Sequence, residues 1–169
     1  MIRRALRRSL HGSLAAAAVL IAGSVVRADA PPGQYETFNR SDTCIKDAFT
    51  KLTWQRAPLA STQTFAGAAT QCAALGTDWR VPSVNELETL VDENPHEELE
   101  NGVLTPKAID ANAFPGTPVG SNYWTSSVAG GNAWTVDFHD GSTSTMAQST
   151  PLEVRCVVAS PSSTPTACQ

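Results

Sequence analysis

The sequence lacks the short motifs that identify many enzymes and metal sites. It contains no Gly-x-Ser-x-Gly nucleophile motif, no Cys-x-x-Cys pair and no Asp-x-Asp-x-Asp-Gly calcium loop. Only three histidines occur in 169 residues, and the many carboxylates form no discernible acid–base pair. The sequence therefore predicts no catalytic residue, no metal site and no cofactor. Calcium would suit the acidic oxygens, but no motif supports it.

Basic residues are scarce after residue 30. Residues 1–30 hold five of the 12 basic residues and one of the 16 acidic residues, which leaves seven basic and fifteen acidic residues and a net charge near −8. Nucleic acids and heparin-like polyanions bind clustered Lys and Arg. We therefore expect no nucleic-acid partner, whereas a cationic partner fits this charge.

The long apolar run at residues 14–26 is too short for a membrane-spanning helix, which needs roughly 20 apolar residues. Four arginines between residues 3 and 8 precede the run, and Ala28-Asp29-Ala30 follows it as a small-x-small signal. This order is typical of a secretory signal peptide. We expect residues 1–30 to be removed, leaving a secreted or periplasmic protein that starts at Pro31 and has no membrane span. An uncleaved membrane anchor is the alternative.

All four cysteines lie in the exported part of the chain: Cys44, Cys72, Cys156 and Cys168. An even number of cysteines in an oxidising compartment favours two disulfides. The sequence alone allows three pairings.

The apolar spacing predicts two helices. Thr64 can cap the first helix, and Gly76 stands where that helix should stop. Its apolar face would comprise Phe65, Ala68, Ala69, Cys72 and Leu75. Ser83 and Glu86 form a Ser-x-x-Glu capping box for a second helix that we expect to end near Asp92.

The remaining segments predict strands and one long loop. Residues 35–56 alternate as two or three short strands around Asp47, and residues 93–121 are expected to be an irregular excursion rich in Pro and Gly. Residues 122–138 alternate again, and the Asp140-Gly141 turn leads to a returning strand at 143–146. Val154, Cys156 and Val158 would form one face of a last strand.

We expect the large aromatic side chains and most charged side chains to have structural rather than ligand-binding roles. Trp54, Trp79, Trp124 and Trp134 are expected in the core, because tryptophan is highly buried on average. A sugar-stacking platform is the alternative for these rings. Arg80 and Arg155 are expected to be buried partners of carboxylates, with Asp137 as a candidate. The acidic run at residues 86–100 is interpreted as a solvated surface.

Five short sequence motifs occur along the chain in a fixed order. They are residues 47–54, Cys72-Ala73-Ala74-Leu75, residues 79–87, residues 123–127 and residues 134–138. This order resembles the DUF1566 family, also called the Lcl C-terminal domain, from about Cys44 to Val158. Lys51 stands where the family has glycine. If that glycine serves a positive-φ turn, the turn is expected to be strained or different here.

The resemblance implies a disulfide-linked α+β domain with a C-type lectin-like fold, in which two helices pack on small antiparallel sheets beside a long irregular loop region. A disulfide in that fold ties the first helix to the last strand, which are the positions of Cys72 and Cys156. Cys44 and Cys168 are then left to pair, with free or intermolecular thiols as the alternative. The family-like domain spans residues 44–158, between a leader with a first strand at 31–43 and a tail at 159–169.

The resemblance also implies a non-catalytic binding module of the cell envelope, which recognises a glycan or a surface protein as an adhesin does. A structural or interaction domain of an envelope assembly is one alternative. An enzyme like the formylglycine-generating branch of the fold, which uses redox-active cysteines, is another. The Glu-Pro-Asn, Gln-Pro-Asp and Trp-Asn-Asp tripeptides that hold calcium in sugar-binding C-type lectins are absent. The resemblance therefore does not imply calcium-dependent sugar binding by this chain.

We place the ligand site on the irregular surface from Gly116 to Asn132 and on the hairpin at 137–140. Loops on a disulfide-linked scaffold can present polar groups without disturbing the core. The candidate ligand-binding residues, whose side chains can donate or accept hydrogen bonds, are Asn122, Asn132, Asp137, His139 and Asp140.

Overall fold

The computed structural model describes residues 30–38, 41–100, 102–159 and 166–168, so the expected signal peptide lies outside the described residues except for its last residue, Ala30. The first sheet has the strand order β1-β2-β3-β9 and comprises β1 (Tyr35–Phe38), β2 (Ser41–Asp47), β3 (Leu52–Gln55) and β9 (Val157–Ala159). The second sheet is a hairpin of β4 (His96–Glu100) and β5 (Val103–Lys107). The third sheet comprises β6 (Asn122–Ala129), β7 (Asn132–Asp137) and β8 (Thr143–Ala147). The helices are α1 (Phe65–Ala73), α2 (Val84–Glu88) and the short 3-10 helix η1 (Thr166–Cys168).

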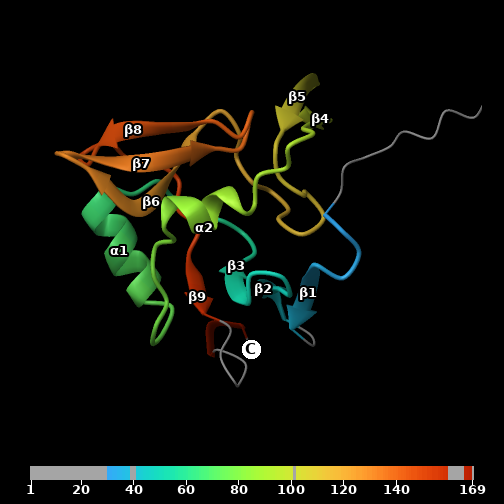
Figure 1. Ribbon diagram of the computed structural model, residues 1–169, viewed down its shortest axis with the longest axis horizontal. Helices are drawn as coiled ribbons and strands as arrows, with labels where there is room; N and C mark the ends of the chain where they lie inside the picture. Colours follow the sequence, from blue (N-terminus) through green and yellow to red (C-terminus); the bar gives the residue numbers. More distant parts are fainter. Residues whose placement is uncertain (1–29, 39–40, 101, 160–165, 169) are drawn as a thin grey trace, which may run out of the picture.

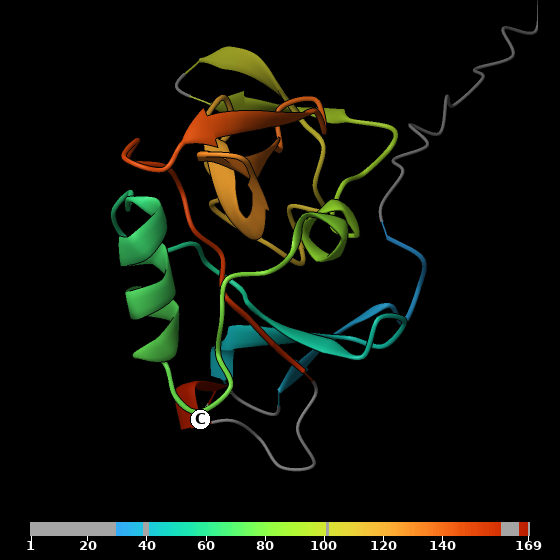
Figure 2. The same ribbon diagram turned by 60° about the vertical axis from the view of Figure 1, so that its left-hand side comes forward.

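The helices occupy different places relative to the sheets. Figure 1 and Figure 2 show α2 between the three-stranded and four-stranded sheets, while α1 lies along one side of the molecule. The hairpin β4–β5 lies at the periphery, beyond the end of α2. This arrangement confirms the predicted α+β class with two helices on small antiparallel sheets.

Helix α1 forms where the sequence predicts it. The Thr64 side chain accepts a hydrogen bond from the Gly67 N–H, and Gly76 has a φ of 138° just beyond the helix. Ala68 and Cys72 are buried four residues apart, on one stripe of the helix. Ala69 is exposed, so the predicted apolar face is wrong at this position: α1 packs on the body along this narrow stripe.

Helix α2 begins with the predicted capping box, in which the Ser83 side chain accepts from the Glu86 N–H and Glu86 accepts from the Ser83 N–H. Glu86 also accepts from Arg80 at 2.6 Å, and this hydrogen bond lowers the pKa of Glu86 to about 2. The helix ends at Glu88 rather than near Asp92, which corrects the prediction. The Asp92 N–H donates to the Ala108 carbonyl, so the chain turns toward β5 instead of continuing the helix.

The hairpin β4–β5 was not predicted, because residues 93–121 were expected to be irregular throughout. Five antiparallel pairs run from His96–Lys107 to Glu100–Val103. Three glutamates in β4 and a proline in β5 hide the strand signal, since these residues are depleted in strands. The segment from Ile109 to Ser121 keeps the predicted irregular form.

The N-terminal strands agree with the predictions more closely. Three short strands lie between residues 35 and 55, and Leu52 and Trp54 are both buried. Lys51 has a φ of 62°, so it adopts the left-handed conformation expected where the family has glycine.

Two disulfides join the parts of the domain. Cys72 of α1 pairs with Cys156 before β9, and Cys44 of β2 pairs with Cys168 of η1. Both pairs are those that the family resemblance implies. All four cysteines are buried in one apolar cluster with Trp79 and Trp124. The predicted last strand is shorter than expected, but Val154 and Val158 share this cluster with Cys156 as predicted.

Candidate functional site

The sheet β6–β7–β8 has one side covered by α1 and the core. Trp124 and Ala133 are fully buried there, and the Trp124 Nε1–H donates to the Gln63 carbonyl at 2.8 Å. Phe65 of α1 packs edge-to-face against Trp124. This side of the sheet therefore belongs to the core.

The other side of the sheet is covered over only part of its length. Tyr123 and Val136 are opposite each other in the β6–β7 register, and both are buried in a cluster with Leu87 of α2 and with Phe138. Side chains two residues apart on a strand share a face. Trp134 therefore belongs to the same face as Val136, one row farther from the buried cluster.

Trp134 is the exception among the tryptophans. Trp54, Trp79 and Trp124 are buried, as predicted, but Trp134 is 36% exposed. The prediction of a core position for Trp134 is therefore wrong. Its partner across the β7–β8 ladder is Thr145, so β8 offers the ring no apolar side chain in that row.

Exposed polar side chains surround the Trp134 ring on this face. Asn132 is exposed two residues before Trp134, and Thr143 and Thr145 are exposed on the neighbouring strand β8. We call these four residues, Asn132, Trp134, Thr143 and Thr145, the Trp134 surface. It combines an indole ring with two hydroxyl groups and a carboxamide on a hydrogen-bonded sheet.

The five predicted ligand residues do not form one site. Asn122 and Asp137 are opposite each other in the register, and the turn after Asp137 carries His139 and Asp140. Asn132 lies at the other end of β7, five residues or roughly 17 Å from Asp137. The structure thus brings four of the five together and separates Asn132 from them.

The four residues at the turn have hydrogen bonds of their own. An Asp137 carboxylate oxygen accepts from the His139 N–H at 2.8 Å, and Asp140 accepts from the Ser142 N–H at 2.9 Å. Hydrogen bonds from Ser142 lower the pKa of Asp140. The Asn122 side-chain Oδ1 accepts from the hydroxyls of Thr135 and Ser144. These contacts fix the carboxylates of Asp137 and Asp140 and the Asn122 side chain in place.

The predicted partners of the two arginines are only partly correct. Arg80 pairs with a carboxylate as predicted, but the partner is Glu86 rather than Asp137 and the pair lies on the surface. Arg155 is fully buried as predicted, but it donates to the carbonyls of Gln55 and Arg56 and to Thr117 Oγ1. The acceptors described for Arg155 are thus uncharged.

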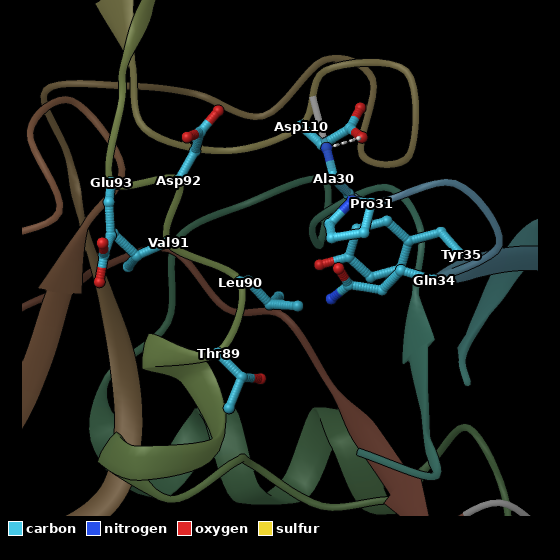
Figure 3. A pocket seen from close by; sticks show the side chains of 10 residues that line it. All are labelled: Ala30, Pro31, Gln34, Tyr35, Thr89, Leu90, Val91, Asp92, Glu93 and Asp110. Carbon is cyan, nitrogen blue, oxygen red and sulfur yellow. Dashed lines mark hydrogen bonds between the residues drawn. The ribbon is translucent and has the colours of Figure 1, made fainter. Parts of the chain in front are cut away.

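An acidic pocket lies at the foot of the hairpin β4–β5. Its cavity measures about 180 Å³ and is lined by Ala30, Pro31, Gln34, Tyr35, Thr89, Leu90, Val91, Asp92, Glu93 and Asp110. Figure 3 shows Asp92 on one side, with Asp110 and Tyr35 across from it. The Ala30 N–H donates to Asp110 at 3.3 Å. The lining holds three carboxylates and no basic side chain. Cleavage after Ala30 would remove the Ala30 donor and would leave the positively charged α-amino group of Pro31 at this pocket.

Two of these pocket carboxylates, those of Asp92 and Asp110, also act on Tyr35. Burial raises the pKa of Tyr35 above its ordinary value of 10.0, and the charges of Asp47, Asp110 and Asp92 raise it further. Burial also raises the pKa of Tyr123. Both phenols therefore keep their protons in the folded protein at pH values where free tyrosine ionises.

The two tyrosines of the chain are consequently expected to stay silent in an alkaline titration. Tyrosinate absorbance should be negligible at pH 10 in the native protein and should develop near pH 10 in denaturant. Folded-state pKa values above the unfolded values give a stabilising contribution that is complete below pH 10 and is lost as the pH rises through them. Native tyrosinate absorbance with a midpoint near pH 10 would contradict this assignment.

A second cavity is mainly apolar. It measures about 290 Å³ and is lined by Thr43, Cys44, Gln55, Ala57, Leu75, Trp79 and Ala167. Neither cavity is lined by any of the five predicted ligand residues. Within the described residues, no three His, Cys, Asp or Glu side chains are placed to hold a metal ion. Neither helix in that part of the chain has the length and apolar content required to cross a bilayer.

The model of the Lcl C-terminal domain family matches residues 43–158. The chain belongs to this family. No curated protein sequence matches it. Among solved structures, the crystal structure of botrocetin is similar to this chain with a TM-score of 0.43 and 8% sequence identity, over 78% of this chain and 99% of botrocetin. Likeness at that level does not establish a C-type lectin-like fold.

The Lcl C-terminal domain of this chain contains the whole Trp134 surface and the hairpin β4–β5. It also contains the Cys72–Cys156 disulfide, whereas Cys168 lies beyond the matched residues. Sequence reasoning missed Trp134 as a surface residue. The one signal available was the polar Thr-Ser-Thr sequence of β8, which supplies no apolar partner for the ring from that strand.

Proposed function

We propose that the protein is an exported, non-catalytic binding module that recognises glycans through the Trp134 surface. The observation that carries this proposal is the Trp134 indole, 36% exposed on a strand face whose neighbours are exposed threonines. Tryptophan is enriched at binding interfaces, because its ring is apolar and its N–H can donate a hydrogen bond. Its position on a sheet, rather than on a loop, supports a preformed site.

The chemistry of the Trp134 surface suits a sugar ring. The indole offers a flat apolar face against the C–H groups of a pyranose, and the hydroxyls of Thr143 and Thr145 can donate or accept hydrogen bonds. The Asn132 carboxamide adds two donors and one acceptor at the end of the same face. The sheet holds the backbone of all four residues, so little backbone entropy is lost on binding.

Other features of the structure support the exported and non-catalytic parts of this proposal. Two disulfides support an oxidising compartment such as the periplasm or the cell surface. All four cysteines are paired, which disfavours the redox chemistry of a formylglycine-generating type of enzyme. A C-type lectin-like arrangement remains part of this proposal. Membership of the Lcl C-terminal domain family supports a binding role.

Glycan binding is expected to depend on Trp134 and not on the turn at residues 137–142. A glycan array probed with the mature protein should give specific binding, and Trp134→Ala should abolish it in a variant that circular dichroism shows to be folded. Because Trp134 itself is almost two-thirds buried, the substitution should cost about 1 to 3 kcal/mol of stability. Asn132→Ala should weaken binding. His139→Ala should leave it unchanged, because His139 lies at the far end of β7.

Phe49→Ala is the matched control, because Phe49 is also an exposed aromatic residue but lies in the turn between β2 and β3. It should bind glycans like the wild type. Loss of binding in His139→Ala but not in Trp134→Ala would place the site at the turn. An array with no specific signal would favour a structural or interaction domain of an envelope assembly.

A further inference from the structure

The hairpin β4–β5 exposes large apolar side chains. Leu99 and Leu104 are opposite each other in the register and are 71% and 59% exposed. Val103 beside the turn is 64% exposed, but it is opposite Glu100 and therefore lies on the other face of the hairpin. Contiguous exposed apolar side chains on a soluble domain usually mark a contact surface. The hairpin is a two-stranded sheet with no further strand in the described structure.

The two faces of the hairpin differ in character. Residues opposite each other share a face, so Glu97, Leu99, Leu104 and Pro106 form one face, which we call the apolar hairpin face. The other face carries His96, Glu98 and Lys107, which form a linked group. Lys107 Nζ lies 2.8 Å from a Glu98 carboxylate oxygen, and His96 Nε2 lies 3.3 Å from the other.

The charges around the apolar hairpin face are negative. Glu97 is exposed on that face, and Asp92, Glu93 and Asp110 line the pocket where the chain enters and leaves the hairpin (Figure 3). Lys107 is nearly buried and paired with Glu98, so it does not offset these charges on the outside. A docking partner thus meets Leu99 and Leu104 with Glu97 on the same face, and the carboxylates of the pocket lie farther along, at the foot of the hairpin.

The negative charge near the apolar hairpin face determines which kind of partner can bind there. A second copy of the chain would bring like charges together, which is destabilising. Anionic membrane surfaces attract basic segments and would repel this one. We propose that the apolar hairpin face docks a protein partner whose contact segment presents apolar side chains beside Lys or Arg. The apolar residues contact Leu99 and Leu104, and the cationic groups lie toward Glu97 and the acidic pocket.

Synthetic peptides test this docking surface directly. Fluorescence anisotropy would measure binding of the mature protein to a labelled peptide of alternating Leu and Lys. Matched peptides would carry Glu in place of Lys, or Ser in place of Leu. The Leu/Lys peptide should bind and weaken as salt is added. Both matched peptides should bind at least about tenfold more weakly, because each removes one of the two contacts.

Variants of the hairpin locate the contact. Leu99→Ser with Leu104→Ser should reduce affinity for the Leu/Lys peptide at least about tenfold, as expected for central apolar contacts. Phe49→Ser removes an exposed apolar residue elsewhere and should bind like the wild type. Circular dichroism and thermal unfolding would verify that each variant is folded. Trp134→Ala should leave peptide binding unchanged, so this inference can fail without affecting the glycan proposal.

Three results would overturn the inference. The first is that the Leu/Lys peptide fails to bind, the second is that the Leu/Glu peptide binds as tightly as the Leu/Lys peptide, and the third is that the folded double variant binds as tightly as the wild type. Sedimentation of the mature protein alone should give a monomer. A dimer that dissociates in the double variant would assign the apolar hairpin face to a second copy of the chain.

Discussion

Replacing Cys72 and Cys156 together with alanine is expected to lower the free energy of unfolding by about 4 kcal/mol. The two cysteines are 84 residues apart, and the chain-entropy model gives roughly 4.5 kcal/mol for closing a loop of that size. The disulfide joins α1 to the segment before β9 inside one buried cluster, so its loss also loosens packing. Urea unfolding of the oxidised protein and the double variant would measure the difference.

The other disulfide provides a matched comparison. Cys44 and Cys168 are 124 residues apart, so the entropic model alone predicts a similar effect. This bridge, however, ties only the end of the chain after β9, which can detach without unfolding the remainder. Cys44→Ala with Cys168→Ala should therefore cost less. Equal losses, or less than about 1 kcal/mol for the Cys72–Cys156 pair, would contradict the role assigned to that bridge.

Arg155→Met is expected to destabilise the protein by about 3 to 5 kcal/mol. The guanidinium donates to the Gln55 and Arg56 carbonyls and to Thr117 Oγ1 at 2.7 Å, and it lies 4.7 Å above the Phe114 ring. Methionine fills the space but donates nothing, so buried acceptors lose their partner. Thermal or urea unfolding would measure the loss.

Burial lowers the pKa of Arg155 to about 10, which reflects how poorly the charge is solvated. The methionine variant removes that cost, and this relief opposes the loss of hydrogen bonds. Arg80→Met is the matched control, since its partly exposed pair with Glu86 should contribute at most about 1 kcal/mol. A stability for Arg155→Met equal to that of the wild type would show that the desolvation cost cancels the hydrogen bonds.

Local signals in the sequence predicted the local structure well. Thr64 and the Ser83–Glu86 box place the helix starts, because capping depends on residues that are adjacent in the chain. The family resemblance, rather than a local signal, drew attention to Lys51, where the structure has a positive φ in place of the family's glycine. The cysteine pairs followed from the family resemblance rather than from local pattern.

Tertiary context explains what the sequence could not predict. Alternation in β7 assigns Trp134 and Val136 to one face of the sheet. It cannot predict that α2 covers Val136 and leaves Trp134 exposed to solvent. Arg155 was expected beside a carboxylate, whereas backbone carbonyls satisfy it. Every residue has a backbone carbonyl, so the sequence cannot indicate which carbonyls will accept hydrogen bonds from Arg155. The strands of β4–β5 form in spite of weak propensity, because five cross-strand pairs join them.

The most direct test of the central claim is an NMR titration of the mature protein with a glycan that the array retains. The four tryptophans give separate indole N–H signals, and Trp134 has the one exposed ring among them. The account predicts that the Trp134 indole and the Asn132 carboxamide signals move with the added glycan, while those of Trp54, Trp79 and Trp124 stay in place. Shifts confined to His139, Asp140 and the turn around them, with an unmoved Trp134 signal, would contradict it.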